Sequence, residues 1–205
     1  MNFSSAIKII ASCACCVYVN TAFSHVSLEQ KSAVAGSTYK AVFQVSHGCQ
    51  GSATTAISVQ LPPGFQHAKP YPKPGWTLTT AMSKLTQPYN NHGKPVTDEV
   101  TEINWTASSK EAALPDAYFD EFMLRGKLPD AASPLWFKVL QTCENGKADW
   151  SQMPAAKNPA QKLEFPALRL EMTGSGSVVA TPSLPNSLSP VIQTQQVPSH
   201  GEHKH

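Results

Sequence analysis

His25 is the residue whose type and position could most directly do chemistry. The small-x-small pattern Ala22-Phe23-Ser24, which signal peptidases cut after, comes directly before it. Cleavage after Ser24 would leave His25 as the first residue, with an α-amino group and an imidazole as two nitrogen donors. An α-amino group has an ordinary pKa of about 7.7–8.0, so a metal can displace its proton at neutral pH. Nitrogen and oxygen donors in a planar arrangement suit Cu(II). The alternative interpretation is a cleavage site that happens to leave histidine first.

An export signal is predicted over residues 1–24. Lys8 supplies the positive charge, and an apolar run follows from Ile9 to Val19. The run is shorter than the roughly 20 residues that span a bilayer, and no later segment qualifies. We therefore expect a periplasmic or secreted protein without a membrane span. A competing interpretation is a lipoprotein signal ending at Cys13, which would keep His25 internal.

Two cysteines, Cys49 and Cys143, remain after export, because the other three lie in the signal. An even pair in an oxidising compartment predicts a disulfide. The alternative is a pair of soft copper ligands.

Strand patterns continue along most of the mature chain. Apolar residues recur at every second position, and Pro- and Gly-rich turns separate the segments. The expected strands are 38–46, 56–61, 76–82, 99–107, 118–125, 135–142 and 163–172. The sequence therefore predicts an all-β fold, an immunoglobulin-like β-sandwich, over residues 25–173.

The composition changes at Gly174, after which Ser, Pro and Gln dominate and the periodicity ends. Such a segment buries too little apolar surface to order itself, so residues 174–205 are predicted to be a disordered C-terminal tail. Its last residues include His200, Glu202, His203 and His205, either a metal-capturing tail or a solvated one.

The formal net charge of +2 is small and scattered, which argues against nucleic acid as a partner. No nucleophile–base pair, Gly-rich phosphate loop or Cys-x-x-Cys motif is present in the sequence, which weakens hydrolase, nucleotide-binding and zinc-site hypotheses.

Several segments, in this order, resemble the YcnI-like copper-binding domain family of exported bacterial proteins. The similarity covers about residues 25–170 and is carried by these segments: His25-Val26-Ser27-Leu28-Glu29, His47-Gly48-Cys49-Gln50-Gly51-Ser52, Pro72-Lys73-Pro74-Gly75-Trp76, Phe119-Asp120-Glu121-Phe122, and Trp136-Phe137-Lys138 through Gln141-Thr142-Cys143-Glu144-Asn145-Gly146 to Trp150.

The resemblance implies a β-sandwich that holds Cu(II) through a single-histidine brace, completed by an acidic oxygen and a nearby tryptophan. His25 matches the brace, and Trp150 follows the Glu-Asn-Gly turn as the family's tryptophan does. Glu121 is the favoured oxygen donor. Glu29 comes second, since an extended segment 25–29 would place it on the face of His25. Asp120 carries less weight.

Other residues have simpler interpretations. His47 beside Cys49 could bind metal or only cap a loop, and His92 reads as a turn residue. His67 is a weaker candidate, and Trp136 reads as a core residue.

The expected function is copper trafficking, buffering or metallation without catalysis, in exchange with a copper-receiving or copper-importing membrane protein. One alternative is a copper enzyme of the polysaccharide-oxygenase type, in which His92 would complete a two-histidine brace. The other is a sandwich that acts only as a protein-interaction module.

Overall fold

The computed structural model describes residues 26–157 and 161–174. Apart from one short 3-10 turn, the regular secondary structure in these residues is all strand. The elements are β1 (Ser27–Leu28), β2 (Ser32–Val34), β3 (Thr38–Val45), β4 (Thr54–Gln60), β5 (Gln66–Pro70), β6 (Trp76–Asn91), β7 (Lys94–Ala107), the 3-10 turn η1 (Lys110–Ala112), β8 (Asp120–Lys127), β9 (Leu135–Cys143), β10 (Lys147–Trp150) and β11 (Leu168–Thr173).

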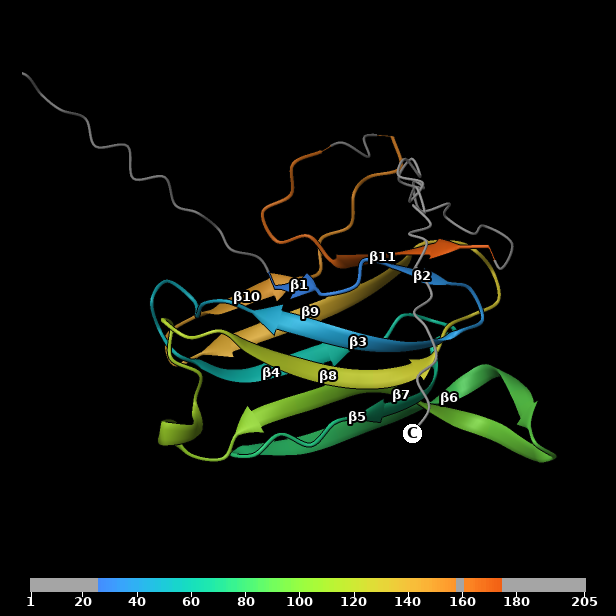
Figure 1. The fold of residues 1–205 in the computed structure, drawn as a ribbon, viewed down its shortest axis with the longest axis horizontal. Coiled ribbons are helices and arrows are strands. Elements are labelled where there is room, and N and C mark those ends of the chain that lie inside the picture. The colour runs from blue at the N-terminus through green and yellow to red at the C-terminus, as the bar shows by residue number, and fades with distance from the viewer. Residues whose placement is uncertain (1–25, 158–160, 175–205) are drawn as a thin grey trace, which may run out of the picture. The chain divides into compact units, whose positions relative to one another are not determined.

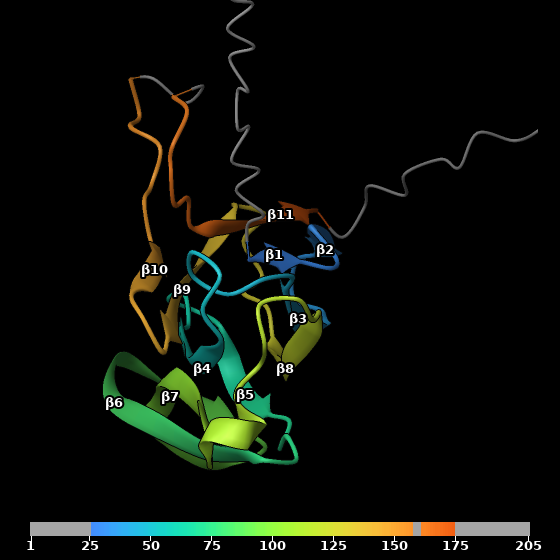
Figure 2. The same cartoon turned by 90° about the vertical axis from the view of Figure 1, so that its left-hand side faces the viewer.

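The strands form two sheets that face each other (Figures 1 and 2). One sheet has the order β1-β3-β8-β5, and the other has the order β2-β11-β9-β4-β7-β6, with β10 beside the second half of β9. Neighbouring strands are antiparallel, except that β2 runs parallel to β11. The predicted all-β sandwich of immunoglobulin-like type is confirmed.

The core lies between the sheets and follows from the period-two pattern. On β3, Tyr39, Ala41, Phe43 and Val45 alternate inward, and all four are buried. The Phe137 ring of β9 meets the Phe43 ring edge-on, at 5.6 Å between centroids. Side chains of opposite sheets thus interdigitate, which fixes the register of each strand.

The largest differences from the expected strand boundaries are in two regions. Residues 163–167 are not part of a strand, and β11 begins only at Leu168. Pro166 lacks an N–H group and makes only an isolated bridge to Gln152, which interrupts the ladder there. The hairpin of β6 and β7 is much longer than expected, because its polar outer part pairs without burying a face.

One core assignment was wrong. Trp136 lies on the outer side of β9, half-buried, with the Arg169 guanidinium 5.6 Å from its ring centroid. Its neighbours Leu135 and Phe137 point inward instead. Alternation predicts which residues share a face of the strand. Which of the two faces is buried depends on where the opposite sheet packs.

In the described ranges, no helix is long and apolar enough to cross a membrane. The predicted signal (1–24), His25 and the tail beyond Gly174 lie outside the described residues.

Candidate metal centre

The chain is held firmly directly after position 25. Val26 is 5% exposed and Leu28 is 3% exposed, and both belong to the core. Ser27 pairs with Gln44 and Leu28 pairs with Phe43 of β3, and β1 is the edge strand of this sheet. The packing of alternate residues fixes where the backbone of β1 lies.

A row of polar side chains crosses the outer face of this sheet from Ser27. The Ser27 hydroxyl donates to Gln44 Oε1 at 3.3 Å, and Gln44 Nε2 donates to Glu121 Oε1 at 3.3 Å. The row follows the register, because Ser27 lies opposite Gln44 and Gln44 lies opposite Glu121. Glu121 therefore belongs to the same face as Ser27.

The Glu121 carboxylate is half-buried. No Lys, Arg or His of the described residues forms a salt bridge with it. A carboxylate with one neutral amide as its side-chain hydrogen-bond donor keeps spare lone pairs, as an oxygen ligand needs.

Asp120 is engaged elsewhere. Lys73 Nζ donates to Asp120 Oδ1 at 2.6 Å, and the same carboxylate oxygen accepts the Glu121 backbone N–H at 2.8 Å. The ammonium also lies 4.9 Å from the centroid of the Phe122 ring. These contacts tie one oxygen of Asp120 to Lys73 and to the backbone, which makes it a weaker ligand candidate than Glu121.

Glu29 is placed differently from the expectation of an extended 25–29 segment. β1 ends at Leu28, and the chain bends at Glu29, whose side chain is exposed. The pKa of Tyr39 is raised to about 12, mainly by burial and secondarily by the negative charge of Glu29. The charge of Glu29 therefore acts on the Tyr39 phenol, whose hydroxyl donates to the Gln30 carbonyl at 2.6 Å.

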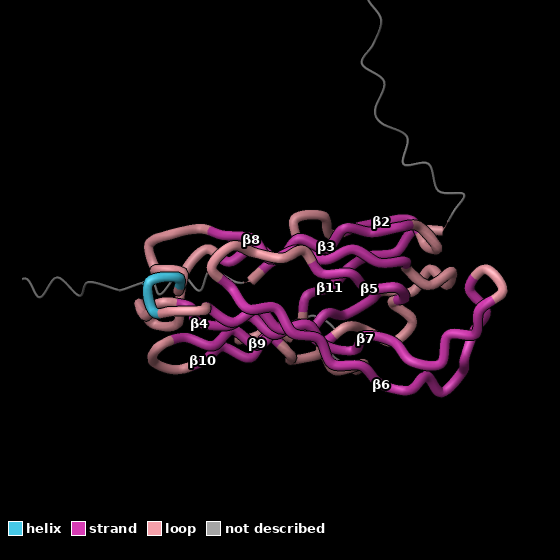
Figure 3. The backbone as a smooth tube through the Cα atoms, turned by 90° about the horizontal axis from the view of Figure 1, so that it is seen from below, coloured by secondary structure: helices cyan, strands magenta, loops and turns pink. Residues whose placement is uncertain are grey.

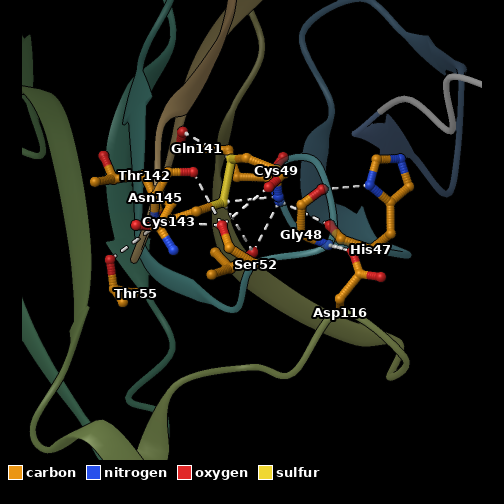
Figure 4. Close-up of a disulfide and its surroundings, with 11 residues drawn as sticks. His47, Gly48, Cys49, Ser52, Thr55, Asp116, Gln141, Thr142, Cys143 and Asn145 are labelled. Carbon is orange, nitrogen blue, oxygen red and sulfur yellow. Dashed lines mark hydrogen bonds between the residues drawn. A yellow bond between two sulfur atoms is a disulfide. The ribbon is translucent and has the colours of Figure 1, made fainter.

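The predicted disulfide joins Cys49 to Cys143, which are 94 residues apart (Figure 4). Cys49 and Ser52 exchange backbone hydrogen bonds around a tight turn. Gln50 and Gly51 at the centre of this turn have φ values of 51° and 84°. Two central residues of positive φ are typical of a type I′ turn, and glycine meets that demand without steric cost.

His47 lies just beyond this turn, on the other side of Gly48 from the disulfide (Figure 4). Its carbonyl accepts a 2.8 Å hydrogen bond from Nε2 of Gln141, which is 1% exposed. The Asp116 carboxylate accepts the Gly48 N–H at 2.9 Å. The backbone at His47 is therefore fixed from two sides, and its ring Nδ1 contacts the Gly48 carbonyl.

Trp150 is a core residue, 2% exposed, whose ring meets the Phe165 ring edge-on at 5.0 Å. It lines a cavity of about 250 Å³ beside the disulfide, together with His47, Gln50 and Glu164. The sequence analysis did not name Glu164 as a candidate. The only feature of the sequence that could have pointed to it is its position directly before the aromatic residue Phe165. Residues 26–28 and residues 166–169 line a second cavity of about 260 Å³.

The structure thus brings Ser27, Gln44 and Glu121 together in one place, and His47, Trp150 and Glu164 in another. The Phe165 ring contacts Trp150, and residues 166–168, which come next in the chain, line the second cavity together with Val26 and Ser27. The segment 165–168 therefore runs from the Trp150 group to the Ser27 group. Residues 26–157 and 161–174 contain no group of three or more His, Cys, Asp or Glu suited to a metal. They supply candidate oxygen donors but no complete ligand set, and His25 lies outside them.

His67 and His92 are at the other end of the sandwich, where both line a third cavity. Figure 3 shows the tip of the β6–β7 hairpin at that end, and η1 at the opposite one.

Comparison with known proteins adds a family. Residues 25–172 match the family described as a domain of unknown function, DUF1775. The chain belongs to the DUF1775 family. YcnI-like proteins are part of the same family, which agrees with the resemblance seen in the sequence.

A solved structure supports the fold. An uncharacterized protein from Nocardia farcinica with an immunoglobulin-like fold is 28% identical, with a TM-score of 0.56, over 72% of this chain and 97% of that chain. A chain from a cohesin–dockerin complex of Clostridium thermocellum is 9% identical with a TM-score of 0.34, over 73% and 98% of the two chains, which is too distant to inform the fold. No curated protein matches this DUF1775 chain.

Proposed function

We propose that this DUF1775 protein is an exported Cu(II)-binding protein that traffics or buffers copper without catalysing a reaction. The amine and imidazole of a cleaved His25 would chelate the ion, and Glu121 would supply an oxygen. When bound, the cupric ion is cargo, so the protein's work is to hold it and release it to a copper-receiving membrane protein.

The observation that carries this proposal is the polar row from Ser27 through Gln44 to Glu121. A residue preceding Val26 has its Cα about 3.8 Å from that of Val26, because the peptide bond fixes the distance. Since Val26 and Leu28 are anchored in the core, an amino terminus at position 25 would start at this same edge of the sheet. A pre-positioned donor lowers the entropy lost when the metal binds.

The choice of oxygen donor follows from the contacts of each carboxylate. Asp120 is paired with Lys73, and Glu29 lies past a bend, where it acts on the Tyr39 phenol. Glu121 has a neutral amide as its donor and shares a face with Ser27. Trp150 lies in the other place, with His47 and Glu164. Its indole is a poor ligand, so the role proposed for it is core packing rather than coordination.

The test is a Cu(II) titration of the mature chain beginning at His25, followed by electron paramagnetic resonance. We expect sub-micromolar binding with a nitrogen-rich spectrum. Placing one residue ahead of His25 removes the free amine and should abolish the site, and His25→Ala should do the same. Unchanged affinity in the extended chain would reject the proposal.

The carboxylates are separated by a matched set of variants. Glu121→Gln should weaken binding by about tenfold, since an amide oxygen replaces a charged ligand of a divalent ion. Glu29→Gln and Glu164→Gln serve as controls that change charge by the same amount and should bind as the parent does. A loss confined to one of the controls would move the ligand assignment to that residue and refute Glu121.

A further inference from the structure

A polar cavity of about 560 Å³ lies at the hairpin end of the sandwich, away from the disulfide. Its walls come from β5, from β8 and from the tip of the β6–β7 hairpin, which extends beyond the sheets in Figure 1. The residues that matter here are His67, Lys69, Tyr89, His92, Arg125 and Lys127. Its volume is in the range of small-molecule sites.

The backbone departs from regular strand geometry in two of these walls. The β5–β8 register shifts between Gln66 and Lys69, and His67 between them has a φ of 54°. The β6–β7 register shifts between Lys84 and Tyr89, and His92 in the turn has a φ of 50°. Bulges redirect side chains, and a positive φ in a residue other than glycine is uncommon. Here both histidines are turned to line one cavity.

A buried carboxylate holds two of the lining residues in place. Glu99 is 8% exposed and accepts the Tyr89 hydroxyl and the His67 backbone N–H, the latter at 3.2 and 3.3 Å to its two oxygens. The His67 ring lies edge-on to the Tyr89 ring at 5.5 Å, and its Nδ1 is 3.9 Å from Glu99. The charge of Glu99 is thus engaged by these donors.

The positively charged side chains around the cavity lie close enough to repel one another. Arg125 lies directly opposite Lys69 on one side and opposite Lys40 on the other. Like charges at opposed positions of neighbouring strands destabilise a sheet. Lys127, on the same strand, has only a 3.9 Å exposed pairing with Asp130. A bound anion would remove this repulsion.

We infer that this cavity binds the phosphate group of a small soluble ligand. Arg125 presents a planar fork that matches two phosphate oxygens, and Lys69 and Lys127 act as point charges. The amide side chains of Gln66, Asn90 and Asn91 also line the cavity and can bond the hydroxyl groups of a phosphate ester. This site is independent of copper and needs no terminal amine.

The experiment uses the mature chain with one residue added ahead of His25, so that its outcome does not depend on the copper site. Backbone amide resonances are followed by NMR during titration with inorganic phosphate and with glycerol 3-phosphate, against chloride at equal ionic strength. We expect phosphate-specific shifts concentrated at residues 66–69, 89–92 and 125–127. Equal shifts with chloride would overturn the inference.

Variants locate the site. Arg125→Ala and Lys69→Ala should each weaken binding about tenfold or more, the usual effect of losing a charge-assisted hydrogen bond. Lys84→Ala removes a cation from the same hairpin outside the cavity and should bind as the parent does. Wild-type affinity in the Arg125 variant would contradict the assignment. Vesicles containing phosphatidylglycerol form the last arm, and binding to them without binding to the soluble phosphates would overturn the soluble-ligand inference in favour of a lipid headgroup.

Discussion

At the disulfide end of the sandwich, a covalent bond, a tight turn and the buried amide of Gln141 hold the backbone around His47. At the hairpin end, the cavity depends on one buried carboxylate, Glu99, and on bulged strands with exposed cations around them. The first end resists change because its contacts are buried and covalent. At the second end, Arg125 lies opposite two lysines, and Lys127 has only an exposed 3.9 Å pairing with Asp130, so this end is better suited to a ligand that comes and goes.

The largest expected effect that tests this contrast is the removal of the disulfide. Replacing both Cys49 and Cys143 with Ser should lower the free energy of unfolding by about 4 kcal/mol, because the bond closes a long loop in the unfolded chain. Urea denaturation of the oxidised parent and the double variant measures the difference. The phosphate-induced shifts at residues 66–69 should persist in the folded double variant, since distant sites are energetically independent. A loss of those shifts would show that the two ends are coupled.

The next effect concerns the turn that positions His47. A Cβ at Gly48 would lie 1.7 Å from the Ser52 carbonyl oxygen, so Gly48→Ala forces the backbone to move. We expect a loss of about 3 kcal/mol in the free energy of unfolding, at the upper end for overpacking. Gly51→Ala, in the same turn, meets no atom within 4 Å and has only its φ of 84° to overcome, so it should cost about 1 kcal/mol. Equal losses in thermal or urea denaturation would mean that the turn has room at Gly48.

The smallest effect belongs to the hairpin end. Tyr89→Phe removes the hydrogen bond to Glu99 and should cost about 1 kcal/mol. Partial burial and the neighbouring Glu99 raise the pKa of Tyr89 above its ordinary value. The folded state therefore holds the phenolic proton more tightly, and this contribution is complete below about pH 10 and is lost as the pH rises further.

The pH dependence gives the check. The difference between the parent and the Tyr89→Phe variant in urea denaturation should be clear at pH 8 and should shrink at about pH 11. Comparing two chains at each pH cancels the titration of the other tyrosines and lysines. A difference that is unchanged at the higher pH would place the Tyr89 phenol outside the Glu99 network.

The sequence predicted the sandwich well because alternation is a local property. Residues such as Phe43 and Val59 recur at every second position, and one face must be buried. It failed at the 163–167 segment, where Pro166 breaks the ladder, and at Trp136, whose burial depends on which face the opposite sheet covers. The short strands β1, β2, β5 and β10 were missed, because two to five residues carry too little pattern.

The candidate copper site divides in the same way. The hypothesis of a terminal histidine chelate came from residue type and position, and the preference for Glu121 came from the resemblance to the YcnI-like family; both remain predictions. The structure added contacts that separate the carboxylates: Lys73 on Asp120, a bend at Glu29 and Gln44 on Glu121. The contacts to Asp120 and Glu121 join residues 47 and 77 positions apart, so they depend on the tertiary structure.

The sequence by itself determined the strand periodicity, the cysteine pair and the residues capable of binding a metal, since each is a matter of residue type and local spacing. Only the tertiary structure decided that Arg125 stands between Lys40 and Lys69, and that His67, Tyr89 and Glu99 form one network. Those neighbours come from different strands, and the order of strands in a sheet is set by how whole faces pack, which no short stretch of residues encodes.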